Sequence, residues 1–309
     1  MEILGRKLSD KIITDGVRIS SFLGARNEEV FSYEEGRLQR VVRENSVFHI
    51  QNVADYLRAF YSDESWKGSD LPCIAPPYPS FFMEYRTAQS DAVYNAGIKR
   101  AGILFETQTD KTLYRNTVDP KDLDATKWIL RGTVIHDNGD LKPMVTTSHD
   151  LFVMEDGRLL GNGESLSTLV CERLGGKSAA PEDQVDDLVR SNLGQEIFTS
   201  LLAVSFMHCH GARTRVEEPP VKLSKRHEKK TGHPLTKYHI IDIDPLRELL
   251  LKEGQVESHG LVRALHEVRG HFADYREKGL FGRTQGIFWK PDHRRGDIES
   301  GQVIKDYNI

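Results

Sequence analysis

The sequence predicts an α+β protein with antiparallel sheets, a buried central helix and a C-terminal, mostly antiparallel unit of four strands. Residues 126–161 contain strand-like segments separated by turn dipeptides. Residues 181–209 begin with proline and acidic residues and then become apolar on most faces. Domains commonly hold about 100–150 residues. We therefore divide the 309 residues into a mixed body, 1–210, and a basic, histidine-rich α+β unit, 211–309, which we take as the active unit.

The first third of the chain predicts short strands and one helix. Residues 16–24 alternate roughly as a strand does, and residues 55–61 place apolar side chains at helical spacing. Four prolines in 71–86 exclude a helix before Pro79 and favour a strand after it. Residues 101–108 read as a further strand.

The middle of the chain predicts an antiparallel meander. Strand-like segments cover 127–136, 141–148 and 151–155. Asn-Gly at 138–139 and Asp-Gly at 156–157 favour tight turns, because such turns need positive φ.

The rest of the chain reads as helices, one polar segment and further strands. The polar segment, 211–234, has paired prolines and many basic residues, and predicts a surface loop or linker. We expect helices at 165–174, 181–209 and 245–254, and strands at 238–244, 286–291 and 302–309.

Charge is distributed unevenly along the chain. The net charge is -4, but residues 211–309 hold 19 Lys/Arg against 15 Asp/Glu and seven of the twelve histidines. This distribution suits an anionic partner at that end, although such an excess is also ordinary for a surface. No apolar run approaches the ~18 residues that span a bilayer. Three scattered cysteines form no disulfide framework, so we expect a cytoplasmic protein without a membrane partner.

The segment 264–282 gathers charged and aromatic residues around one glycine. If 264–275 is a strand, alternate side chains share one face. A following strand at 287–295 would place more such residues beside them. The residues that would converge are Glu267, Arg269, His271, Tyr275, Trp289, His293 and Arg295.

This set has the chemistry for cleaving RNA without a metal. Such cleavage needs a base for the 2′-hydroxyl proton, an acid for the leaving oxygen and cations for the charged phosphorane. We assign proton transfer to Glu267, His271 and His293, and phosphate binding to Arg269 and Arg295. Tyr275 and Trp289 would stack bases. Further substrate contacts are expected from Arg283, Arg294 and Lys305. The resulting hypothesis is a toxin-like ribonuclease that needs no cofactor and prefers RNA to DNA.

Four alternatives stay open. The charged residues could form cross-strand ion pairs on an ordinary exposed strand. The segment 245–270 could instead be a helix-turn-helix that binds DNA as a regulator. The acidic body also fits an inhibitor of a host or defence protein. Histidines 259, 266, 271 and 293 could hold the metal of a hydrolase, although their spacing is not that of a helical pair.

The C-terminal segment resembles a family of uncharacterised bacterial proteins encoded by phages and mobile elements. Its motifs are H-x-x-R-G-H-F, L-F-G, G-x-x-W, H-x-R-G and a closing K-D-Y. They lie at 266–272, 280–282, 286–289, 293–296 and 305–307. "APPYPSFFMEY", starting at Ala75, is similar to a second block of this family. The resemblance implies a phage or mobile-element origin and assigns no activity.

Overall fold

The structure is a computed structural model in which the chain divides into two compact units. The sheet unit holds Met1–Met207 and Thr214–Ile241, and the hairpin unit holds His208–Arg213 and Asp242–Ile309. The structure describes residues 7–19, 28–60, 71–89, 97–108, 110–115, 118–139, 141–160, 197–210, 212–242, 264–268, 271–280, 284–290, 293–295 and 297–302.

An eight-stranded sheet forms the middle of the sheet unit, in the order β1-β6-β5-β4-β3-β2-β8-β7. Strands β3 to β6 pair antiparallel with their neighbours in the chain, whereas β2 pairs parallel with β3 and β8, and β1 with β6. The strands are β1 (Arg18–Ile19), β2 (Ser46–His49), β3 (Ser80–Arg86), β4 (Arg100–Gln108), β5 (Thr126–Asp137), β6 (Met144–Met154), β7 (Arg213–Glu217) and β8 (Tyr238–Asp242).

The antiparallel meander predicted for 126–161 is confirmed. Its turn glycines have positive φ, 96° at Gly139 and 87° at Gly157. The Asp137 carboxylate accepts a hydrogen bond from the Gly139 N–H at 2.9 Å, which closes the first turn. The two strands expected at 141–148 and 151–155 are one strand, β6, because its pairing with β5 continues through both.

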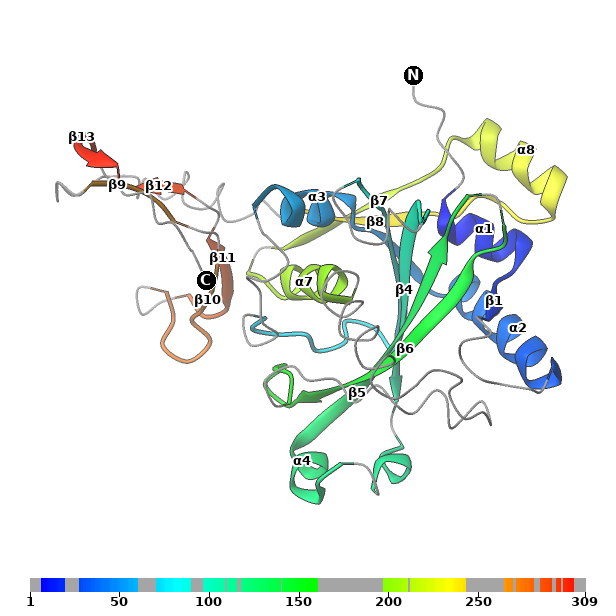
Figure 1. Cartoon of the computed structure of the whole chain (residues 1–309), viewed down its shortest axis with the longest axis horizontal. Coiled ribbons are helices and arrows are strands. Elements are labelled where there is room, and N and C mark those ends of the chain that lie inside the picture. Colours follow the sequence, from blue (N-terminus) through cyan, green and yellow to red (C-terminus); the bar gives the residue numbers. More distant parts are fainter. Residues whose placement is uncertain are drawn as a thin grey trace. The chain divides into compact units, whose positions relative to one another are not determined.

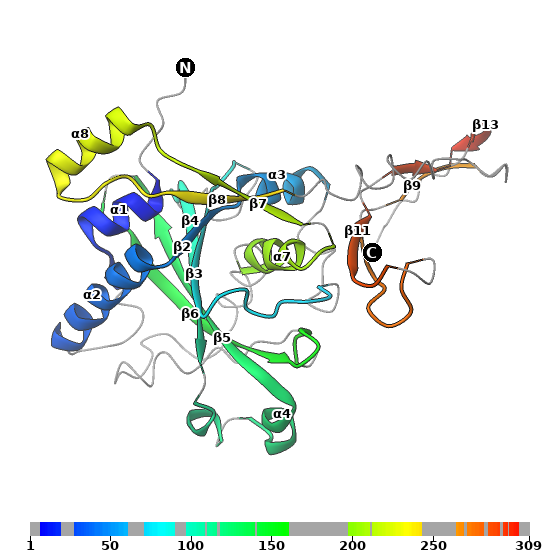
Figure 2. The same cartoon turned by 180° about the vertical axis from the view of Figure 1, so that it is seen from behind.

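Helices cover both faces of this sheet (Figure 1, and from behind Figure 2). Helices α1 and α2 lie against one face, and α3 and α7 against the other. The described helices of the unit are α1 (Leu8–Asp15), α2 (Glu28–Glu44), α3 (Gln51–Phe60), the short 3-10 helix η5 (Thr112–Tyr114), α4 (Pro120–Ala125), α7 (Phe198–Met207) and α8 (Val221–Thr231).

The first third of the chain is more helical than predicted. Only α3 was expected, near 55–61; α1 and α2 were not. Leu8 and Ile12 of α1 and Leu38 and Val42 of α2 are buried at helical spacing in one core with Phe82 of β3. The spacing is visible afterwards, but polar residues separate these apolar positions, so packing on the sheet decides the helices.

The buried helix predicted within 181–209 is confirmed where the structure describes it. All residues from Phe198 to Phe206 of α7 are buried. The Ser205 hydroxyl donates to the Cys73 carbonyl at 3.0 Å, and the Phe206 ring meets Tyr56 of α3 edge-on. The expected helices at 165–174 and 245–254 lie outside the described residues.

The segment expected to be a linker at 211–234 is instead a strand and a helix of the sheet unit. Strand β7 follows β8 at the edge of the sheet, and α8 begins directly after Pro220. Gly232, with φ 80°, ends α8, and its N–H donates to the Glu228 carbonyl at 2.8 Å. The paired prolines start a helix here instead of excluding one. The expected boundary at 211 is therefore displaced, because 214–241 belong to the first unit.

The described part of the hairpin unit contains five short strands in two sheets, in place of one four-stranded unit. One sheet pairs β10 with β11, and the other has the order β12-β9-β13. Residues 264–268 and 271–274 are strands, which rules out a helix over these residues; the rest of the helix-turn-helix alternative, 245–263, lies outside the described residues. The strands are β9 (Ala264–Val268), β10 (His271–Asp274), β11 (Ile287–Lys290), β12 (His293–Arg295) and β13 (Asp297–Gln302).

Candidate active site

One face of the β10–β11 hairpin collects polar side chains. The antiparallel register places His271 opposite Lys290 and Ala273 opposite Phe288. Because alternate side chains of a strand point to the same face, these four residues share one face of the hairpin. Side chains directly opposite each other in such a pair have Cβ atoms about 5 Å apart.

Two further residues extend this face. The ring of Tyr275 lies 5.8 Å from that of Phe288, and Lys290 Nζ donates a hydrogen bond to the Tyr275 hydroxyl at 3.0 Å. The ring of His210 stacks on Phe288 with centroids 4.9 Å apart and planes at 21°. His210 is held there because its backbone N–H donates to the Ile287 carbonyl at 2.6 Å. We call the following residues the histidine face: His210, His271, Tyr275, Phe288 and Lys290.

The histidine face combines solvent access with a fixed cation. His210 and His271 are exposed, Tyr275 and Lys290 are half-buried, and Phe288 is buried beneath them. Imidazoles exchange protons near neutral pH, and an ammonium group neutralises a phosphate. The bond to the Tyr275 hydroxyl restricts the flexible lysine side chain. The face thus offers two proton carriers and one positioned positive charge.

The opposite face of the hairpin is apolar, which removes one predicted role. Trp289 is only 3 % exposed, and its ring meets Phe272 edge-on at 4.7 Å. We expected Trp289 to stack a substrate base beside His271, but the strand alternation directs it away from that residue and into the core. Of the two aromatic residues predicted to stack bases, only Tyr275 lies on the histidine face.

The other predicted residues that the structure describes belong to a second sheet. Glu267 stands opposite Arg294, and His293 opposite Val268, in the pairing of β9 with β12. Arg295 follows in the same strand. These positions belong to a different sheet from His271. The remaining predicted positions, Arg269, Arg283 and Lys305, lie outside the described residues.

Sequence reasoning missed three members of the face, Phe288, Lys290 and His210. Lys290 follows Trp289 in a strand that was predicted, but arginines were taken as the phosphate contacts. His210 directly follows the helix expected at 181–209, and no role was expected for it. Its position depends on a bridge between Cys209 and Ile287, which are far apart in the chain, so no local pattern indicates it.

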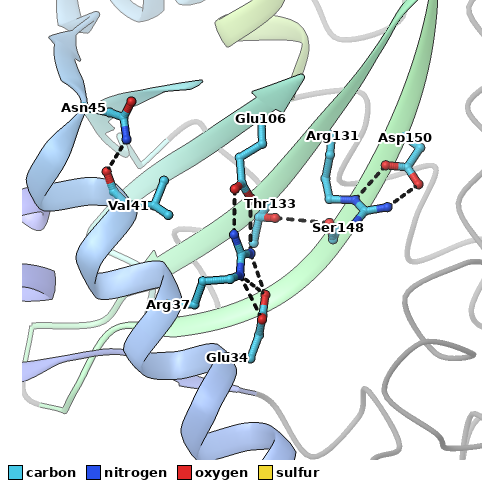
Figure 3. Close-up of polar contacts among 9 residues, drawn as sticks. All are labelled: Glu34, Arg37, Val41, Asn45, Glu106, Arg131, Thr133, Ser148 and Asp150. Atoms are coloured by element: carbon cyan, nitrogen blue, oxygen red, sulfur yellow. Dashed lines mark hydrogen bonds and ion pairs between the residues drawn. The ribbon is translucent and has the colours of Figure 1, made fainter. Parts of the chain in front are cut away.

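A second group of charged residues crosses the sheet unit (Figure 3). The Arg37 guanidinium donates to Glu34 at 2.8 Å and to Glu106 of β4 at 2.6 Å. Arg131 of β5 forms two hydrogen bonds, at 2.8 and 2.9 Å, with the buried Asp150 carboxylate of β6. Burial would lower the pKa of Arg131, but the bonds to Asp150 raise it overall. The charges are paired, which makes this group a structural network.

Within the part of the chain that the structure describes, Glu84 is a buried carboxyl group whose pKa is clearly altered. It is 3 % exposed and accepts hydrogen bonds from the N–H and hydroxyl of Ser9, at 2.7 and 3.1 Å. Burial, followed by repulsion from Asp10, raises the pKa of Glu84 to about 7. The hydrogen bonds satisfy the N-terminus of α1, so Glu84 connects this helix to β3.

Two histidines of the sheet unit are held neutral. Burial and then the charges of Lys7 and Arg86 lower the pKa of His49 to about 4. Burial lowers the pKa of His149 to about 4 as well. Perturbed groups of this kind occur in active sites and in cores. The His149 ring bonds the Thr147 hydroxyl at 2.9 Å within the sheet, as a core histidine does.

Two further searches cover only the part of the chain that the structure describes. No group of three or more His, Cys, Asp or Glu residues there could hold a metal ion. No helix there is long and apolar enough to cross a membrane. The predicted four-histidine metal site is not tested, because His259 lies outside this part.

Comparisons of the chain with the sequence models of protein families and with the curated proteins give no match.

Proposed function

We propose that this chain is a nucleic-acid-directed protein and that the histidine face cleaves single-stranded RNA without a metal. The observation that supports the proposal is the pairing of exposed His271 with Lys290, whose ammonium is bonded to Tyr275. Metal-free cleavage of RNA requires proton carriers and a cation close to one phosphodiester. The face offers both on a rigid hairpin.

Each residue has one role in this reaction. His271 takes the proton of the 2′-hydroxyl, and the 2′ oxygen attacks the neighbouring phosphorus. The bond to the 5′ oxygen breaks, and His210 donates a proton to that oxygen. Lys290 stabilises the negative charge of the phosphorane. The products are a 2′,3′-cyclic phosphate and a 5′-hydroxyl end.

The test is cleavage of a labelled single-stranded RNA by the full chain in excess EDTA. We expect cleavage to persist and His271→Ala to reduce its rate by about 10²–10⁴-fold, as for loss of a general acid or base. Lys290→Ala should act similarly, whereas Lys278→Ala, an exposed lysine of the following turn, should not. Circular dichroism verifies that the variants fold.

Other results point to other functions. If EDTA abolishes cleavage, the metal-dependent hydrolase is correct instead. Salt-sensitive binding of nucleic acid without turnover identifies a non-catalytic regulator. Stable association with a host protein, without nucleic acid, identifies an inhibitor.

A further inference from the structure

Helix α8 presents a continuous positive face. Its lysines and arginine lie at spacings i, i+3, i+4, i+7 and i+8, which is the pattern of a single side of an α-helix. The residues are Lys222, Lys225, Arg226, Lys229 and Lys230. Ser224, His227 and Thr231 occupy the other side and are less exposed. The helix therefore packs through Ser224, His227 and Thr231 and displays its cations.

The positive charge of the C-terminal third is concentrated here, in the sheet unit. Residues 213–237 hold eight Lys/Arg against three Asp/Glu, whereas the other residues from 211 to 309 hold eleven against twelve. The ion pairs described in 213–237 join Arg215 with Glu217 and Lys237 with Glu218, both exposed. Among the described residues, no ion pair reaches the cations of α8.

The cations of this face also repel one another. Like charges three or four residues apart repel each other, and α8 contains several such pairs, Lys222 with Arg226 and Lys225 with Lys229 among them. No residue of α8 is buried. A bound polyanion would relieve the repulsion, because it places negative charge along the face.

A cavity of about 520 Å³ lies beside the first half of α8 and meets the positive face at Lys225. Lys225 of α8 lines it, together with Arg43 at the end of α2 and His233 and Lys237 after α8. Glu218 also lines the cavity and pairs with Lys237 at 2.7 Å, so the excess positive charge comes from Lys225 and Arg43. Ligand sites commonly measure about 300–1,000 Å³, so the cavity has the size and the charge for one nucleotide.

We propose that α8 and this cavity bind the phosphate backbone of single-stranded RNA. The eleven residues of α8 span about 16 Å, the length of several nucleotides. A single strand can turn one base away from its neighbours and into the cavity, which a duplex cannot. The choice of RNA rests on the proposed function; the attraction for a polyanion does not.

The composition of α8 disfavours an anionic membrane as the partner. Helices that lie on membranes present a broad apolar face beside the basic one. Among the eleven residues of α8, only Val221 and Leu223 are apolar, and both are in its first turn. Cations on successive turns, without an apolar face beside them, are suited to binding the phosphates of a polyanion in solution.

The test measures binding of a short, labelled 2′-O-methyl oligouridine, which lacks the attacking 2′-hydroxyl, by the full chain. We expect the triple variant Lys222→Gln, Arg226→Gln and Lys229→Gln to raise the Kd at least about tenfold. Its salt dependence, log Kd against log salt, should lose a slope of about 2, since each phosphate contact contributes about 0.7 for a single strand. Glutamine preserves helix propensity.

The matched control removes three exposed lysines from other elements, as Lys121→Gln, Lys127→Gln and Lys142→Gln, and should leave the Kd within about twofold. Equal affinities of the two triple variants would overturn the inference. So would tighter binding to phosphatidylserine vesicles than to RNA. Cleavage that depends on His271 but not on α8 preserves the proposed function alone. Binding that depends on α8 without cleavage preserves this inference alone.

Discussion

The raised pKa of Glu84 predicts how the stability of the sheet unit depends on pH. Its pKa is about 7 in the folded protein, against 4.5 for an ordinary glutamate side chain. The folded state therefore binds this proton more tightly than the unfolded state does. The stability that the neutral carboxyl contributes is fully present below pH 4.5 and is lost as the pH rises through about 7.

The size of this effect follows from the shift. Each pKa unit corresponds to about 1.4 kcal/mol, so raising the pKa from 4.5 to about 7 corresponds to about 3 kcal/mol. In Glu84→Gln the side chain stays neutral at every pH and keeps an oxygen that accepts from Ser9. We therefore expect the variant to gain about 3 kcal/mol in unfolding free energy relative to wild type between pH 4.5 and pH 8.

His49 and His149 act in the opposite direction, and the comparison removes their effect. Both have a lowered pKa of about 4. The stability that depends on their neutral form is present above pH 6.5 and is lost as the pH falls through about 4. Wild type and Glu84→Gln share these histidines, so their contributions cancel in the difference between the two proteins.

The assay is urea unfolding at a series of pH values, followed by circular dichroism. Glu155→Gln is the matched control, because this carboxylate is 84 % exposed and its ion pair with Lys127, at 3.4 Å, lies on the surface. Its difference from wild type should stay within about 0.5 kcal/mol at every pH. A flat difference curve for Glu84→Gln, or one that falls as the pH rises, would refute the reasoning.

Two further predictions concern β6 and the turn after it. Asp150→Asn leaves the Arg131 guanidinium without its buried countercharge and should lower the unfolding free energy by about 3 kcal/mol; Asp156→Asn, at an exposed pair, should cost less than about 0.5 kcal/mol. Gly157→Ala should cost about 2–4 kcal/mol, since φ is 87° and the new Cβ would collide with Cys73 Sγ. Adding Cys73→Ala should restore only the part of the unfolding free energy that the clash removes. Urea unfolding that shows full recovery, or none, would contradict the view that both the positive φ and the clash contribute.

Local patterns were sufficient for the antiparallel part of the sheet. Gly139 and Gly157 require conformations that other residues adopt rarely, so their turns can be predicted from a dipeptide. The strand after Pro79 follows from the restriction that proline imposes. The segment 213–231 was misread because paired prolines and many charges are typical of loops and equally of an exposed helix that begins after a proline.

The candidate sites depend on neighbours that the sequence does not show. The alternation at 271–275 was predicted, and it places His271 and Tyr275 on one face. The strand that lies opposite decides that their neighbour is Lys290 and that Trp289 is buried. Likewise, the spacing of the five cations in α8 can be seen in the sequence. The packing of the opposite side of the helix, through Ser224, His227 and Thr231, decides that the cations face solvent.

The sequence by itself determined the α+β class, the turns of the meander and the apolar character of α7, because each depends on residues within a few positions of one another. Tertiary structure alone decided that Glu84 meets Ser9 and that His210 lies on Phe288. Such contacts join segments about 75 residues apart in the chain. They form only when the whole core closes, and no local spacing encodes them.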